Sequence, residues 1–239
     1  MHEIVLKPEV LGQVGFLPVT NTLLVSWMVM AILIVASFLV TKKVSLVPSG
    51  FQNFFESIID LGYTTVEDLA HSKAKVFFPM VMTFFLFIAT ANLIGLLPGF
   101  ATIKFHDVPL LRSINSDLNT TLALALISAV TTHYFAIKYL GLGNYLKRWV
   151  SLEMFPVFLF VGFLEIISEF TKIISLSFRL FGNIFAGEVV LATVSGIFAF
   201  LVPLPFYFLE IIVGFVQAAV FMMLTLVFMV LLSEKHESH

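Results

Sequence analysis

Residues 152–202 read LEMFPVFLFVGFLEIISEFTKIISLSFRLFGNIFAGEVVLATVSGIFAFLV, a mostly apolar run of 51 residues that also contains charged side chains. At a rise of 1.5 Å per residue, one continuous helix over this run would be about 75 Å long. The hydrocarbon core of a bilayer is only about 30 Å thick. The segment therefore either breaks or lies strongly tilted in a membrane.

The composition of the whole chain also indicates a membrane protein. Of its 239 residues, 59% are hydrophobic and 12% are charged, whereas soluble domains have about 45–50% and about 25%. A soluble surface needs more charge than this, so the composition excludes a soluble enzyme, a disordered tail and a coiled coil. The net charge of −2 gives no basic footprint for nucleic acid. Cys is absent, which excludes disulfide frameworks and thiolate metal sites.

Other long apolar segments are expected to be membrane helices, because a span needs about 20 mainly apolar residues. The five expected passes lie at 20–41, 76–97, 118–140, 152–202 and 206–233. Ser116 and Asp117 are candidate caps for the third pass. Pro203 and Pro205 mark a turn before the last one.

Residues 50–72 differ from the passes, because apolar residues recur there at helical spacing between acidic ones such as Asp60 and Glu67. This pattern predicts an amphipathic helix at the interface or against a protein partner. The expected fold class is therefore an all-α polytopic membrane protein with five membrane helices and one interfacial helix. Residues 1–239 are expected to form a single integral membrane domain.

The distribution of Lys and Arg predicts the orientation of the passes. If residues 1–19 lie outside, the inner side carries the larger set of basic residues: Lys42, Lys43, Lys73, Lys75, Lys138, Lys147, Arg148 and Lys235. The outer side then carries Lys7, Lys104 and Arg112. We expect the N-terminus outside and the C-terminus in the cytoplasm. Because the short chain shows no transit peptide at its start, a bacterial inner membrane is the expected location.

Six charged residues have apolar surroundings within these segments, where burying one such group costs at least roughly 2.5–3.5 kcal/mol. They are Glu165, Glu169, Lys172, Arg179, Glu188 and Glu210. They should face protein, water or each other.

Helical geometry, at about 100° per residue, sorts these residues into two faces. Lys172 lies about 20° from Arg179, while Glu165 and Asn183 lie about 40° from it and Glu169 about 80°. Glu188 lies about 180° away if the helix is straight. Glu210 and Gln217 are seven residues apart and share a face of the last helix.

Polar paths on opposite sides of an arginine are the arrangement that an ion relay needs. Carboxylates can exchange protons when burial brings their pKa nearer the working pH, whereas Arg keeps its charge.

Some of these charges also have a simpler interpretation. Lys172 could form a structural ion pair with Glu165 or with Glu169. His133, in the span at 118–140, could be a hydrogen-bonded packing residue or a member of a relay. Arg179 has no acidic residue three or four positions away, so its partner must come from another helix or another chain. The histidines show no metal-ligand spacing.

Residues 175–188, SLSFRLFGNIFAGE, resemble the signature of subunit a of the F-type ATP synthase, the membrane stator of its proton channel. Three further segments resemble the same family in the expected order: VPSGFQNFFE at 47–56, DLNTTLALA at 117–125 and QAAVFMMLT at 217–225. The resemblance covers roughly residues 20–235. It implies that the last two helices form a long, strongly tilted hairpin against the rotor ring.

The resemblance also implies roles for single residues. Arg179 would be the essential arginine facing the ring of c subunits, and Asn183 would line the path nearby on the cytoplasmic side. The outer half-channel would contain Glu188, Glu210 and Gln217, with Asn119 at its mouth. The inner half-channel would contain Glu165 and Lys172.

Glu210 stands where some bacterial members have a histidine. Two nearby carboxylates, Glu188 and Glu210, would titrate as a coupled pair.

The resemblance further implies a c-subunit ring, b subunits of the peripheral stalk and the rest of the F-type complex as partners, besides membrane lipid. ATP would form elsewhere, on the soluble head. The chain has no Walker-type phosphate loop, and we expect no catalytic site, cofactor or metal of its own. Both H⁺ and Na⁺ are compatible with these residues.

Two other classes of function compete with this interpretation. A self-contained secondary transporter usually shows two related halves, and none is evident in the sequence. A purely structural assembly subunit would account for the acidic helix at 50–72 but not for Arg179 and Glu188. The fate of coupled transport after loss of Arg179 distinguishes these classes.

Overall fold

The computed structural model describes residues 8–15, 17–42, 44, 50–97, 104–105, 108–149, 157–197 and 201–234. The sequence predictions at Lys7, Lys43, residues 47–49, residues 152–156, residues 198–200 and Lys235 lie outside this range, as do the side chains of Lys104, Lys147 and Arg148.

The described elements are, in order, β1 (Val10–Val14), β2 (Leu17–Thr20), α1 (Asn21–Lys42), α2 (Phe51–Ala70), α3 (Ala74–Gly95), β3 (Lys104–Phe105), β4 (Val108–Pro109), α4 (Leu118–Leu140), α5 (Leu142–Trp149), α6 (Val157–Ile197) and α7 (Pro203–Ser233).

Among the residues that the structure describes, five helical segments are long and apolar enough to cross a membrane. They correspond to α1, to α2 and α3 joined through the turn at His71–Lys73, and to α4, α6 and α7. The expected all-α polytopic fold is therefore confirmed. Within the joined segment, α2 packs on α3 through Gly62 and Val66, and it leaves acidic side chains such as Glu67 exposed.

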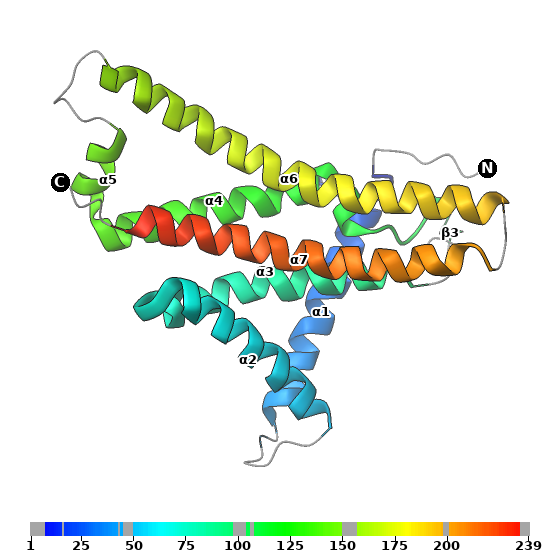
Figure 1. The fold of residues 1–239 in the computed structure, drawn as a ribbon. Coiled ribbons are helices and arrows are strands. Elements are labelled where there is room, and N and C mark those ends of the chain that lie inside the picture. Colours follow the sequence, from blue (N-terminus) through cyan, green and yellow to red (C-terminus); the bar gives the residue numbers. More distant parts are fainter. Residues whose placement is uncertain are drawn as a thin grey trace.

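Helices α3, α4, α6 and α7 lie alongside one another, and α1 crosses the set (Figure 1). At one end of the bundle, called the α5 end here, α3 begins and both α4 and α7 finish. Lys73 Nζ donates there to the Ser233 carbonyl at 2.9 Å. The Phe77 and Tyr139 rings, 5.8 Å apart, join α3 to α4 nearby.

The opposite end, called the α1 end, contains the starts of α1 and α4. Thr22 Oγ1 donates to Asp117 Oδ2 at 2.9 Å, and Asn21 Nδ2 donates to the Pro109 carbonyl at 3.3 Å. The Asp117 side chain also caps α4 by accepting from the Asn119 N–H at 3.0 Å. Loops at this end are thereby tied to two helix starts.

The core lies between α3 and α7 and extends to α4 and α6. Its fully buried large side chains include Phe77, Val81 and Ile88 of α3, Leu180 of α6, and Phe221, Leu226 and Met229 of α7. Exposed apolar side chains such as Ile34 and Phe38 cover α1. Such a surface fits hydrocarbon and not water.

The structure settles whether the long apolar segment breaks. α6 is one helix of 41 residues, about 60 Å long at 1.5 Å per residue. That is about twice the hydrocarbon thickness, so the whole helix does not fit upright within the hydrocarbon core. The first half of α6 diverges from α7 in Figure 1.

Three local features were not expected from the sequence. The segment before α1 contains an antiparallel hairpin, β1 with β2, in which Val14 pairs with Leu17. Gly15 in its turn has φ +65°, a conformation that glycine adopts without strain. α5 is an additional short helix. α7 begins at Pro203, three residues early, because a Pro in the first helical turn lacks only an N–H that would be unpaired there.

Candidate ion path along α6

Arg179 lies near the middle of α6, and its side chain is exposed. Within the described residues, neither an ion pair nor a hydrogen bond holds its guanidinium. A permanently charged group on a membrane helix must face water, protein or a counter-charge. The arrangement therefore presents Arg179 to something outside this chain.

A groove of about 390 Å³ extends along α6 to Arg179 and is closed on one side by Leu224 and Phe228 of α7. Its α6 wall carries the polar side chains Ser168, Thr171, Lys172 and Ser175. Such a lining can hold water beside the arginine on the side toward the α5 end. Glu165 is half-buried on the same helix but is not one of the described lining residues.

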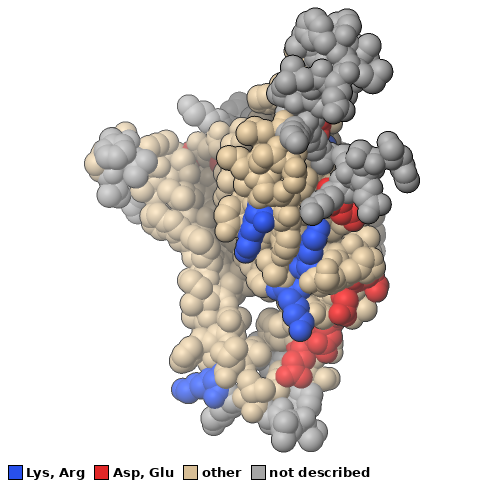
Figure 2. All heavy atoms as spheres, turned by 90° about the vertical axis from the view of Figure 1, so that its left-hand side faces the viewer, with Lys and Arg blue, Asp and Glu red and all other residues tan. Residues whose placement is uncertain are grey.

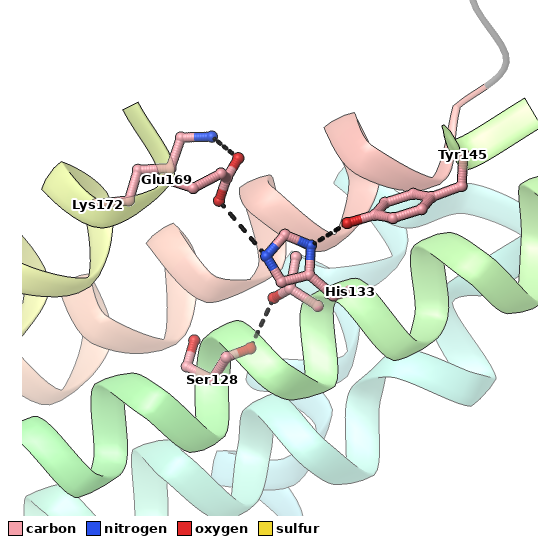
Figure 3. Close-up of polar contacts among 6 residues, drawn as sticks. Ser128, His133, Tyr145, Glu169 and Lys172 are labelled. Carbon is pink, nitrogen blue, oxygen red and sulfur yellow. Dashed lines mark hydrogen bonds and ion pairs between the residues drawn. The ribbon is translucent and has the colours of Figure 1, made fainter. Parts of the chain in front are cut away.

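Lys172 pairs with Glu169, whose Oε1 lies 2.7 Å from the Lys172 ammonium. Glu169 also reaches α4, where its Oε2 lies 3.8 Å from His133 Nε2. His133 Nδ1 is in turn hydrogen-bonded to the Tyr145 hydroxyl of α5 at 2.9 Å (Figure 3). Of the two ion pairs that the sequence left open for Lys172, the structure contains the one with Glu169.

Asn183 and Gln217 join α6 to α7 one turn beyond Arg179. Asn183 Nδ2 donates to Gln217 Oε1 at 2.7 Å. Gln217 is buried, and its amide nitrogen has no partner among the described residues. The resemblance assigns these two residues to different half-channels, whereas here one hydrogen bond connects them.

Glu188 lies farther along α6, against the loop that precedes α4. The side chains of Ser116 and Ser113 are its hydrogen-bond partners, and the positive charge of Arg112 attracts it. Arg112 Nε also donates to Ser116 Oγ at 3.4 Å. The carboxylate is thus held by polar groups of a different segment, at the α1 end.

Glu210 of α7 is only 6% exposed, and its carboxyl group rests directly on Gly187 of α6. A Cβ atom at position 187 would overlap the carboxyl atoms. Oε1 of Glu210 has no hydrogen-bond partner among the described residues. Glu188 and Glu210 are close enough to repel each other electrostatically.

Asn119 is exposed at the first turn of α4, and its side chain donates to Asp117 Oδ1 at 3.1 Å. It lies three residues after Ser116, at the same end of the bundle as Glu188. The polar residues of α6 thus run in order from Glu169 near the α5 end, through Arg179, to Glu188 near the α1 end. Glu169 and Glu188 are separated by about 28 Å of helix, close to the hydrocarbon thickness.

Sequence reasoning missed several members of this arrangement. Ser113 and Ser116 were not recognised as partners of Glu188, and Gly187 was not recognised as the contact of Glu210. No periodicity connects a loop to a distant helix, so no sequence signal could have found the first pair. Among the residues that the structure describes, no group of three or more His, Cys, Asp and Glu could hold a metal ion.

Five apolar helices with a line of charged and amide side chains through their middle define a polytopic membrane protein of the ion-translocating class. Comparisons with known proteins identify the family. A family model described as ATP synthase A chain matches residues 23–230. The chain belongs to the ATP synthase subunit a family, the proton-channel subunit of the F0 sector.

Similar proteins come from several bacteria. ATP synthase subunit a of Geotalea uraniireducens is 40% identical over 206 residues, which are 85% of this chain and 83% of the relative. The protein of the same name from Citrifermentans bemidjiense is 37% identical over 227 residues, 92% and 91% of the two chains. That from Desulfotalea psychrophila is 40% identical over 210 residues, 85% and 80%. The resemblance stated from the sequence is confirmed.

Proposed function

We propose that this chain is the stator of a rotary ion path, with two half-channels that open on opposite sides of the membrane and meet at Arg179. The observation that carries the proposal is the position of Arg179. It lies exposed between a polar cluster at the α1 end and a polar groove toward the α5 end.

In the synthesis direction, a proton comes from the outer side past Asn119 to Glu188. It continues past Glu210 to Gln217, and near there it neutralises a carboxylate on the rotor. A neutral carboxylic acid enters hydrocarbon far more readily than a carboxylate. The rotor can therefore carry it through the lipid.

On the inner side, the returning carboxylic acid meets the groove lined by Lys172 and closed at one end by Arg179. Glu165, on the same helix, belongs to this inner half-channel. The fixed positive charge of Arg179 favours the ionised carboxylate. It therefore promotes proton release and repels a proton moving directly between the two paths. Each charge that crosses 100 mV supplies about 2.3 kcal/mol, which turns the ring.

The proposed partners are a ring of c subunits facing α6, b subunits of a peripheral stalk and the remainder of an F-type complex. The proposed location is a bacterial inner membrane, with the α5 end in the cytoplasm. Figure 2 looks onto that end and shows basic side chains gathered across it, with acidic ones along one side. Lys73 lies there beside the end of α7. The positive-inside rule favours this orientation.

The proposal is tested by ATP-driven proton uptake into inverted membrane vesicles that contain the whole complex. Arg179→Ala should abolish uptake while assembly and ATP hydrolysis by the head persist. Lys75→Ala, which removes an exposed cation away from α6, serves as the control and should pump normally. Normal uptake by Arg179→Ala would show that the arginine is a structural charge and that the stator assignment is wrong.

A further inference from the structure

Four side chains from three helices form a continuous polar cluster on the inner side of Arg179. In order they are Lys172 and Glu169 of α6, His133 of α4 and Tyr145 of α5. The successive atom-to-atom distances are 2.7 Å, 3.8 Å and 2.9 Å. Figure 3 shows the Glu169 carboxylate directed toward one nitrogen of the imidazole and the phenol toward the other. Three of its members, Glu169, His133 and Tyr145, have no role in the path described so far.

The cluster adjoins the groove that contains Arg179. A small cavity of about 20 Å³ is lined by Ser128, Thr132, His133 and Glu169, and it shares Lys172 with the groove. This volume exceeds the roughly 10–15 Å³ that one water molecule needs. A row of side chains that can bind and release protons therefore continues from the groove toward α5.

Exposure increases from Glu169 to His133. The Glu169 side chain is 13% exposed, whereas that of His133 is 28% exposed. Titratable or charged groups of the described residues that lie beside His133 include Tyr145 from α5 and Glu169 and Lys172 from α6. α7 contributes the ring of Phe228, which lies 5.2 Å from the Lys172 ammonium.

Imidazole is the side chain that most readily takes up and releases a proton near neutral pH. When Nδ1–H donates to the Tyr145 oxygen, the lone pair of Nε2 is directed toward Glu169. Tyr145 is thus placed to fix the ring and its tautomer. Lys172 is placed to hold the Glu169 carboxylate.

We propose that Glu169 and His133 form a proton relay at the inner end of the path, with Tyr145 and Lys172 as positioning residues. The proposal rests on the proposed function of the chain. A proton from water in the groove binds Glu169 Oε2, and the carboxylate becomes a carboxylic acid. The proton then moves to His133 Nε2, directly or through one water, which restores the carboxylate and forms imidazolium. Nε2 finally releases the proton to water on the inner side, so one proton enters and one leaves.

The test uses the whole complex in inverted vesicles, where the medium corresponds to the inner side and ATP hydrolysis drives protons through the path in reverse. The initial rate of proton uptake is measured against medium pH from 5 to 9. Glu169→Gln and His133→Gln should each slow proton uptake about three- to tenfold. Each should also remove that part of the dependence of the uptake rate on medium pH which the relay produces. Glu169→Asp should retain that part. ATP hydrolysis by the head should stay normal.

Tyr145→Phe provides a milder variant in case the others fail to assemble. It removes one hydroxyl, frees Nδ1 and should shift the pH profile along the pH axis. Tyr134→Phe makes the same chemical change at an exposed neighbour of His133, and it should leave the profile as in the unmodified protein.

An unchanged profile shape in the assembled Glu169→Gln and His133→Gln variants would overturn the relay and leave the cluster as a structural clamp. If those variants do not assemble, an unchanged profile in Tyr145→Phe would overturn it. Arg179→Ala in the same assay separates the two proposals. Normal uptake by Arg179→Ala refutes the stator assignment, whereas lost uptake together with unchanged relay profiles refutes the relay alone.

Discussion

Gly187→Ala is expected to disable ion translocation by displacing one carboxyl group. The added Cβ would overlap the Glu210 carboxyl, and no other heavy atom lies nearer to it. Glu210 is 6% exposed, so the carboxyl has little room and must leave its position. Overpacking of this kind costs about 1–3 kcal/mol, which corresponds to a change of about 5- to 150-fold in the population of the original position.

A second glycine in the same helix provides a control for the cost of the overlap with Glu210. Alanine is favoured over glycine by about 0.8–1.0 kcal/mol in a helix interior, and this gain partly hides the overlap in Gly187→Ala. At Gly196, a Cβ atom would meet nothing within 4 Å. Gly196 lies in the last turn of α6, so Gly196→Ala carries at most the helix gain and no overlap. The difference between the two variants therefore gives a lower limit for the cost of the overlap with Glu210.

ATP-driven proton uptake and the thermal stability of the purified complex provide the assays. Gly187→Ala should lower uptake at least fivefold and leave the complex less stable than Gly196→Ala does. Glu210→Asp in the same chain should recover part of the uptake, because the shorter side chain withdraws the carboxyl. Full uptake by Gly187→Ala, with stability equal to that of Gly196→Ala, would refute the placement of Glu210 against Gly187.

Two further predictions concern polar contacts between helices. Asn92→Ala removes the side chain that donates to the Gly214 carbonyl at 2.8 Å and accepts from Asn115 at 2.6 Å. Each buried polar group left without its partner costs about 1–3 kcal/mol, so thermal denaturation of the complex should begin at a lower temperature. An unchanged midpoint of denaturation would contradict these contacts. Ser128→Ala breaks the 2.8 Å hydroxyl bond to Thr225. Bonds between membrane helices average only about 0.6 kcal/mol, so the thermal stability of the complex should fall only slightly, and a severe loss of stability would contradict this small contribution.

Much of the fold could be predicted from hydropathy and end signals. The length of each apolar run indicates a membrane helix. Asp117 marks the start of α4, because its side chain accepts a hydrogen bond from the Asn119 N–H in the first turn. Hydropathy alone left open whether residues 152–202 form one helix, since apolar runs in tilted and broken helices look the same. The turn of the β1–β2 hairpin contains Gly15 with a positive φ. The flanking sequence does not indicate this conformation.

The candidate site was predictable in its residue types but not in its pairings. Helical angles place Lys172 near Arg179 and Glu188 on the other side, because those angles depend only on spacing along one helix. Which side chain of a second helix lies opposite depends on how α4, α6 and α7 pack. The contacts of Asn183 with Gln217 and of Glu169 with His133 therefore became visible only in the folded chain.

The central claim, that two paths open on opposite sides of the membrane and meet at Arg179, is tested most directly by thiol accessibility. The chain contains no Cys, so a single substitution introduces its only thiol. Asn119→Cys samples the outer mouth, and Ser168→Cys samples the groove toward the α5 end. Ile34→Cys, on the exposed apolar side of α1, is the lipid-facing control.

The measurement is labelling of this subunit by a small, charged, membrane-impermeant thiol reagent in right-side-out and in inverted vesicles. The account predicts that Asn119→Cys reacts only in right-side-out vesicles, Ser168→Cys only in inverted vesicles, and Ile34→Cys in neither. Labelling of Asn119→Cys and Ser168→Cys from the same side, or of either one from both sides, would contradict two separate half-channels.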